Sequence, residues 1–213
     1  MRLVDLTLPI EKEQKGRPTA DLDRWTITRG QSRYVANVYH FRHDSMAGTY
    51  LDFPGHIEHT DDGAEAADFP LEKLYRMPAT VIRLDCAGGT GKVHAGKLAA
   101  ACPGTFQGEA VILNALGGRR FDEVAFRSVY LGADAAEWLI DGGARLFVSD
   151  VYESDEDPQG VFQAFFAAGV LTVCQPINLD KLTSPKVKLT VLPLRFAGVT
   201  QLPCRIVAEL EDT

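Results

Sequence analysis

Short strand-like runs are spread along the whole chain, and they limit its fold more than any other feature. Each run is rich in β-branched residues or alternates apolar with polar residues, and Gly, Pro or Asp bounds most of them. The runs cover residues 3–10, 33–43, 79–85, 109–116, 145–150, 170–174, 189–196 and 205–211. Three segments, 94–102, 132–143 and 158–169, have helical spacing instead. Strands interleaved with a few helices predict an α/β fold with a mixed sheet.

The length of the chain favours one domain. With 213 residues it falls within the range of a single large domain, so we expect one domain over residues 1–213. The longest apolar stretch, residues 161–174, is too short to cross a bilayer. The N-terminal sequence MRLVDLTLPI enters a strand pattern directly, without the order of basic, apolar and small residues that marks a secretion signal. We therefore expect a cytoplasmic protein with no membrane partner.

Charge and cysteine content exclude two further classes of protein. The net charge is −7 and the basic residues do not cluster, so we expect no nucleic-acid partner. The four cysteines, Cys86, Cys102, Cys174 and Cys204, are dispersed and lack CxxC spacing. This pattern predicts free thiols in a reducing compartment and no zinc knuckle.

The stretch Ser45–His56, SMAGTYLDFPGH, places a carboxylate and an imidazole close together in the sequence. Gly48 allows a turn or a close approach to a ligand, and Pro54 restricts the backbone after Asp52. His56 belongs to the residue type that titrates near neutral pH. Two interpretations are open. Asp52 and His56 can face one cavity, or Asp52 can cap backbone amides in a turn while His56 hydrogen-bonds a carbonyl.

This stretch resembles the signature HxGTHxDxPxH of the cyclase family of metal-dependent hydrolases, which includes the bacterial kynurenine formamidases. Residues 46–56 read MAGTYLDFPGH, so the glycine, threonine, aspartate, proline and final histidine are present. Met46 and Tyr50 stand where the family has histidine ligands of its metal. His56 stands at the position of the catalytic histidine.

The resemblance covers essentially the whole chain. VDLTLPI is similar to the family's first strand, and INLDKL and VLPLRFAGVTQLPCRIVA are similar to its closing segments. It implies a kynurenine formamidase-like swivelling β/β/α fold, with a barrel-like central sheet and flanking helices. It also implies a homo-oligomer, commonly a dimer with the cavity near the subunit interface. We expect Trp25 and Trp138 to pack in the core or at such an interface.

The second half of the family's metal site is a histidine that opens a helix and a glutamate twelve residues later. By this resemblance Phe162 stands at the histidine position and Cys174 at the glutamate position. Asp52 is then the one metal-ligand position that keeps its residue type. Because zinc or manganese needs about three or four convergent donors, we expect no metal cofactor. A rebuilt site that uses Asp52, His56 and Cys174 is the alternative.

Proton transfer by His56 is the chemistry that remains when the metal is lost. We expect His56 to act as a general acid or base, oriented by Asp52 and assisted by the Tyr50 hydroxyl. The reaction would be an elimination, an isomerisation, a cyclisation, or hydrolysis of an activated ester or lactone, on a small aromatic or carbonyl compound. Cys174 could supply a thiolate nucleophile, but its apolar setting, VLTVCQPI, favours a buried inert thiol.

Two other functions remain open at this stage. The chain could be a non-catalytic member of the fold that binds a small molecule in a pocket lined by Met46, Tyr50, Phe162 and Cys174. It could also be a metal-dependent amide hydrolase of the arylformamidase type with a rebuilt metal site. Substitution of His56 separates catalysis from binding, because a general base is essential to turnover but not to a binding pocket.

Overall fold

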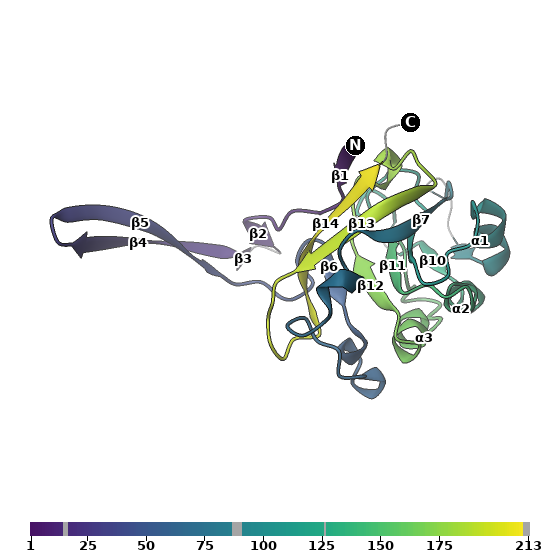
Figure 1. The fold of residues 1–213 in the computed structure, drawn as a ribbon. Helices are drawn as coiled ribbons and strands as arrows, with labels where there is room; N and C mark the ends of the chain where they lie inside the picture. The colour runs from purple at the N-terminus through teal and green to yellow at the C-terminus, as the bar shows by residue number, and fades with distance from the viewer. Residues whose placement is uncertain (15–16, 87–90, 126, 211–213) are drawn as a thin grey trace.

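A closed barrel organises the computed structural model, which describes residues 1–14, 17–86, 91–125 and 127–210. Within these residues seven strands close the barrel (Figure 1). In spatial order they are β14 (Gln201–Leu210), β13 (Lys186–Pro193), β7 (Met77–Arg83), β9 (Ala110–Asn114), β11 (Leu146–Ser149), β12 (Leu171–Cys174) and β6 (Tyr50–Asp52). β6 pairs again with β14, which completes the closure, and β1 (Arg2–Asp5) extends the sheet beside β14.

The central strands β7, β9, β11 and β12 are parallel, and helices cover one side of them (Figure 1). The helices are α1 (Ala95–Ala101), α2 (Ala133–Asp141) and α3 (Val161–Ala167). β8 (Gly91–Val93) and β10 (Val129–Leu131) form a small separate parallel sheet. Short 3-10 turns are η1 (Pro54–His56), η2 (Glu58–Thr60), η3 (Leu71–Lys73) and η4 (Leu179–Lys181). The predicted α/β class with a mixed, barrel-like sheet is confirmed.

Two apolar cores lie on the two sides of the sheet. Successive strand residues face opposite sides, so Ile112 of β9 packs inside the barrel and Leu113 packs under the helices. Burial on both faces explains the continuous apolar run of β9, as expected for a parallel strand beneath helices. Phe165 of α3 packs in the helix-side core, with its ring centroid 5.1 Å from that of Phe147. No helix in the part of the chain described here is long and apolar enough to span a membrane.

Each of the eight predicted strand runs overlaps an observed strand, and each of the three predicted helical segments contains an observed helix, with shifted bounds. The run at 189–196 corresponds to β13, which begins three residues earlier at Lys186. The run at 205–211 falls within β14 as far as Leu210, and Glu211 lies outside the described residues. Six strands of the described residues are missing from the prediction, namely β2 (Glu13–Gln14), β3 (Arg17–Pro18), β4 (Ala20–Arg29), β6, β8 and β10. β4 was missed because it buries little apolar surface and is held as a strand by its pairing with β5 (Ser32–Phe41). β6 was missed because it has three residues and is followed by a proline turn.

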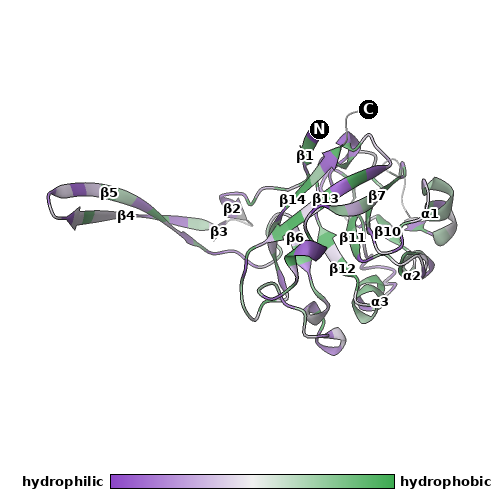
Figure 2. Cartoon of the chain, viewed as in Figure 1, coloured by the Kyte–Doolittle hydropathy of each residue, from purple (hydrophilic) through white to green (hydrophobic). Residues whose placement is uncertain are grey.

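β4 and β5 (Ser32–Phe41) form an arm that projects away from the barrel (Figure 1). They pair residue by residue from Ala20 with Phe41 to Arg29 with Ser32, and they pair with no other strand among the described residues. β2 (Glu13–Gln14) and β3 (Arg17–Pro18) pair near its base. Apolar and hydrophilic segments alternate along the arm (Figure 2). Trp25 lies on this arm, half exposed, so within this chain it is not a core residue.

Candidate active site

The strand β6 positions the predicted site residues between two neighbouring strands. Tyr50 is opposite Cys174 of β12, and Asp52 is opposite both Thr172 of β12 and Gln201 of β14. Tyr50 and Asp52 are two residues apart on one strand, so their side chains share a face. Leu51 between them packs inside the barrel. Tyr50 and Asp52 therefore face the helix side of the sheet.

Asp52 is the centre of a buried polar cluster. It is 1% exposed, and its Oδ2 accepts hydrogen bonds from Thr172 Oγ1 at 3.0 Å and from Cys174 Sγ at 3.5 Å. Its Oδ1 has no hydrogen-bond partner among the described residues. Burial raises the pKa of Asp52, and the nearby Gln201 amide and His56 ring oppose that rise. The hydrogen-bond partners of Asp52 are side chains and not the backbone amides of a turn, which was one of the two interpretations of the sequence.

His56 lies at the end of η1, exposed, and is held by a glutamine. Its Nε2 is 3.2 Å from the Gln201 side-chain nitrogen, and Ser45 Oγ donates a hydrogen bond to the Gln201 side-chain oxygen, Oε1. The ring is edge-on to Phe166, with 6.2 Å between centroids. Among the described residues no hydrogen bond joins His56 to Asp52. Gln201, which is opposite Asp52 in the strand register, is the residue that contacts His56. The sequence analysis missed Gln201, although a polar residue within an apolar closing strand is a signal for it.

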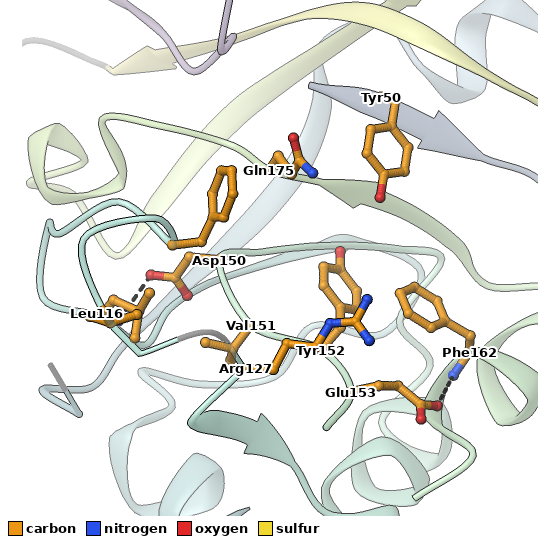
Figure 3. A pocket seen from close by; sticks show the side chains of 11 residues that line it. Tyr50, Leu116, Arg127, Asp150, Val151, Tyr152, Glu153, Phe162 and Gln175 are labelled. Carbon is orange, nitrogen blue, oxygen red and sulfur yellow. Dashed lines mark hydrogen bonds between the residues drawn. The ribbon is translucent and has the colours of Figure 1, made fainter. Parts of the chain in front are cut away.

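A small cavity of about 130 Å³ has Tyr50 of β6 in its wall (Figure 3). Phe162 stacks on Tyr152 with 4.9 Å between ring centroids and an interplanar angle of 13°. Tyr50 and Phe162 are the predicted site residues that line the cavity. Its full lining is Tyr50, Leu116, Phe121, Val124, Arg127, Asp150, Val151, Tyr152, Glu153, Phe162 and Gln175. Met46, Asp52, His56 and Cys174 lie outside that lining.

Met46 and Cys174 differ in burial, because Met46 is exposed and Cys174 is buried. Met46 is 46% exposed, and its N–H donates to Asp44 Oδ1 at 3.0 Å. Cys174 is buried, and burial together with the Asp52 carboxylate raises the pKa of its thiol well above the ordinary value. A thiol that stays protonated is a weak nucleophile. This supports the prediction of an inert cysteine.

The two tyrosines near Cys174 stay protonated at neutral pH. Burial, with Cys174 and Asp52 nearby, raises the pKa of Tyr50. Burial also raises the pKa of Tyr152 well above its ordinary value, and its hydroxyl lies 3.0 Å from the Phe147 carbonyl and 2.7 Å from the Val173 carbonyl. The Tyr152 hydroxyl therefore already donates to backbone carbonyls and is not available to a ligand. Tyr50 presents its phenol at the cavity wall.

Asp150 is an acidic residue of the cavity lining that the sequence analysis did not single out. It follows β11 directly, and its two carboxylate oxygens accept the N–H groups of Ala115 and Leu116, each at 2.9 Å. Burial raises its pKa to about 6. A polar residue at the carboxyl end of a buried parallel strand is the signal that could have found it.

The raised pKa of Asp150 predicts a pH-dependent stability. An unfolded aspartate has a pKa near 3.9, so between pH about 6 and about 4 the folded chain binds more protons than the unfolded chain at this residue. Asp150 therefore makes the free energy of unfolding increase as the pH falls through that window, by at most about 3 kcal/mol. We expect Asp150→Asn to remove this contribution. Urea unfolding of both proteins from pH 7 to pH 4 measures it.

The control for this prediction is internal. Asp52 also has a raised pKa and contributes with the same sign, and it is present in both proteins. The difference between the two stability curves therefore reports Asp150 alone. Parallel curves across the whole range would contradict the prediction.

The residues present do not fit a divalent metal. Asp52 Oδ1 is a buried oxygen without a partner, but the Cys174 thiol hydrogen-bonds the other oxygen of the same carboxylate and His56 Nε2 faces Gln201. Tyr50 and Phe162 stand at two further ligand positions implied by the resemblance, and their side chains are a protonated phenol and a phenyl ring. Among the residues that the structure describes, no group of three or more His, Cys, Asp or Glu could hold an ion. A structural or catalytic metal needs more donors than this.

Comparison with known proteins decides the family. The Cyclase family model matches residues 4–156. The chain belongs to the cyclase family. No curated protein matches it significantly.

Solved structures share the fold of this cyclase-family chain. A predicted metal-dependent hydrolase from Bacillus stearothermophilus is 21% identical, with 97% of each chain covered and a TM-score of 0.69. An isatin hydrolase bound to the product analogue thioisatinate is 19% identical, with 99% of this chain and 92% of that chain covered and a TM-score of 0.68. Isatin hydrolase A from Ralstonia solanacearum is 18% identical over 99% of this chain and 92% of that chain, with a TM-score of 0.73. At these identities the likeness establishes the fold.

Proposed function

We propose that this cyclase-family chain is an enzyme that hydrolyses or cyclises a small aromatic or carbonyl compound by proton transfer at His56, without a resident metal. One observation carries the proposal. Gln201 holds the exposed His56 ring, Ser45 holds the Gln201 amide, and the buried Asp52 lies opposite Gln201 in the strand register. An exposed imidazole held in one orientation beside a carboxyl group is suited to general acid–base catalysis.

The Gln201 amide can support His56 in both forms that a proton-transfer cycle needs. When the amide nitrogen donates to His56 Nε2, the proton of the neutral ring is on Nδ1. Rotation of the amide by 180° turns its oxygen toward His56, which then donates from Nε2, while Ser45 Oγ accepts from the amide nitrogen. In that arrangement a neutral ring has Nδ1 free as a base, and a protonated ring can donate from Nδ1. His56 can thus take a proton from a nucleophile and return it to a leaving group.

The cavity size limits the substrate. Its volume of about 130 Å³ is close to that of an engineered apolar cavity, about 150 Å³, which holds benzene. We therefore propose that it takes one aromatic ring, between Phe162 and the wall formed by Tyr50. The protonated Tyr50 hydroxyl would donate a hydrogen bond to a substrate carbonyl, because its pKa is raised by burial.

The comparisons support a carbonyl substrate of this kind. Isatin hydrolases, which share the fold, act on isatin, a small aromatic cyclic amide. The family that the sequence resembles is one of metal-dependent hydrolases and includes the kynurenine formamidases. Because we propose a reaction without metal, we do not extend the kynurenine formamidase reaction to this chain. A first panel of test compounds therefore contains isatin, N-formylkynurenine, aryl lactones and 4-nitrophenyl acetate.

Metal removal gives a direct test. We expect the purified chain to contain much less than one zinc or manganese per molecule, because the site lacks convergent donors. Turnover of any responsive compound should be the same before chelation, after chelation, and after zinc or manganese is added. Elemental analysis and steady-state rates measure the two quantities.

The opposite result identifies the rebuilt metal site. About one bound metal per chain, with activity lost on chelation, would contradict the proposal of a metal-independent enzyme. The variant Cys174→Ala would then lose the metal if Asp52, His56 and Cys174 hold it. The matched variant Cys204→Ala, at a buried thiol of β14, would keep the metal.

A second function is favoured by a specific observation. The aromatic cavity is lined by neither Asp52 nor His56. A chain that only binds a small aromatic molecule would need the cavity and not the imidazole. Such a protein would show no turnover with any compound of the panel and would bind a ligand equally well after His56→Ala.

A further inference from the structure

Arg127 supplies the positive charge of the aromatic cavity. Of the described residues in the cavity lining, it is the one with a basic side chain. Its guanidinium points into the space between Tyr50, Phe162 and Glu153 (Figure 3). Burial raises the pKa of Tyr50, and the charge of Arg127 opposes that rise. The guanidinium therefore lies within electrostatic reach of the phenol at the cavity wall.

The backbone of Arg127 has a conformation that residues with a side chain rarely adopt. Its φ is 52°, which is in the left-handed region. Four non-glycine residues of the described chain have a positive φ, and two of them, Arg127 and Gln175, line this cavity. Strained backbone of this kind clusters at active sites and ligand sites. The conformation of Arg127 is therefore what we expect of a residue that contacts a ligand.

Arg127 stands at the boundary between two cavities. It forms an ion pair with Asp155, which does not line the aromatic cavity. Asp155 and Arg127 both line a second cavity of about 520 Å³. The side chains of Arg127 and Asp155 are 45% and 64% exposed, and exposed ion pairs contribute little to stability. A carboxylate in the aromatic cavity can therefore take the place of Asp155 at a small cost.

The two acidic residues of the cavity lining are already engaged with the backbone. Both oxygens of Asp150 accept backbone N–H groups at 2.9 Å. Glu153 Oε1 accepts the N–H of Phe162 at 3.2 Å. Their negative charges remain and disfavour an anion in the cavity. Whether the cavity binds an anion or a cation therefore depends on Arg127.

We propose that Arg127 makes this cavity selective for an aromatic compound that carries a carboxylate. The ring packs against Phe162, and the carboxylate replaces Asp155 on the guanidinium. An arginine and a carboxylate form paired N–H···O hydrogen bonds, which are stronger and geometrically more specific than hydrogen bonds between neutral groups. The inference rests on the proposed function for the use of this cavity by an aromatic ring, and it does not involve His56.

Three ligands of the same shape and different charge test the proposal. Benzoate is negative, benzamide is neutral and benzamidine is positive, and each is a benzene ring with one small planar group. We expect the wild-type chain to bind benzoate about tenfold or more tightly than benzamide, because hydrogen bonds to charged groups are the stronger ones. Benzamidine should bind least. Isothermal titration calorimetry at low ionic strength measures the three affinities, and added salt should reduce the preference for benzoate.

The variant Arg127→Gly should reverse the order of the three affinities. Glycine adopts a positive φ without strain, so we expect the variant to fold, and circular dichroism checks this. Benzamidine should then bind more tightly than benzoate, because the charges of Asp150 and Glu153 remain in the lining. The matched variant Arg120→Ala removes a positive charge from the exposed ion pair of Arg120 with Asp122, outside the cavity lining. It should keep the wild-type order.

The variant Asp155→Asn tests the exchange of partners on the guanidinium. Loss of the competing carboxylate should raise the affinity for benzoate about two- to fivefold and leave the affinity for benzamide unchanged. The matched variant Asp122→Asn removes the same charge from the ion pair with Arg120 and should change neither affinity. Equal benzoate affinities of Asp155→Asn and the wild-type chain would contradict the exchange.

The outcomes separate this inference from the proposed function. Equal affinities of the wild-type chain for benzoate and benzamide, or an unchanged order in Arg127→Gly, would overturn the role of Arg127 alone. Absence of binding by all three ligands would overturn it together with the use of the cavity by an aromatic ring. Catalysis by His56 is tested separately, because none of these measurements requires turnover.

Discussion

Replacing His56 with alanine is expected to lower kcat/KM on a responsive compound by about a hundredfold or more. The loss follows because His56 is the exposed imidazole that Gln201 and Ser45 hold beside the buried Asp52. The acidic limb of the pH–rate profile should be reduced or lost in the variant, since a general base stops working when it is protonated at low pH. Steady-state rates from pH 5 to pH 9 give both quantities.

His59→Ala is the matched control for this experiment. His59 is also exposed and lies three residues further along the chain, where its ring contacts Gln163 rather than Gln201. Its removal should leave the rate within about twofold, because surface substitutions away from a site change little. Equal rates for wild type, His56→Ala and His59→Ala would refute catalysis by His56. Ligand affinity that survives His56→Ala without turnover would instead favour the binding function.

Gln201 is a positioning residue in the same scheme. Gln201→Ala removes the amide that orients His56 but leaves the imidazole itself. It should therefore lower kcat more than it raises KM, and by less than His56→Ala does. Gln201→Glu restores one acceptor and should recover part of kcat.

Phe165→Ala is expected to have the largest effect on stability, about 3–5 kcal/mol. Phe165 is fully buried, with its ring 5.1 Å from that of Phe147. Its helix, α3, has seven residues, too few to be stable without packing. For a chain of this size the loss corresponds to a fall in Tm of roughly 10 °C. Urea unfolding and thermal melts measure the change.

Phe162→Ala, on the same helix, is the control for this prediction. Phe162 is half-buried and stacks on Tyr152 at the cavity wall, so its removal leaves a smaller buried void. We expect a smaller loss of stability and a clear loss of affinity for aromatic ligands. Equal destabilisation by both substitutions would show that the cavity wall and the core are not distinct.

The fold was predictable because burial imposes a pattern on the sequence. β9 reads AVILN and α3 reads VFQAFFA, and each shows the apolar pattern that its two-sided or one-sided burial requires. β4 was not predictable in this way, because it is defined by pairing and not by burial. The base of that arm mixes Asp21 and Asp23 with apolar residues, which is also the pattern of a solvated loop.

The site was predictable in part, through the motif of residues 46–56. The motif singled out Tyr50 and Asp52 as site residues, and the strand β6, which was not predicted, places both on one face of the sheet. Gln201 and Asp150 were not found, because each reaches the site through strand pairing between segments far apart in sequence. No local pattern shows that position 201 will lie opposite position 52.

The three-residue strand β6 joins the two ends of the barrel sheet, since it pairs with β12 on one side and β14 on the other. Its residues must keep the cylinder closed whatever reaction they serve. The hydrogen bonds that Asp52 accepts from Thr172 and from Cys174 cross one of these joins. New chemistry at this position must therefore evolve by exchange of single side chains, because an inserted residue would shift the register and open the wall.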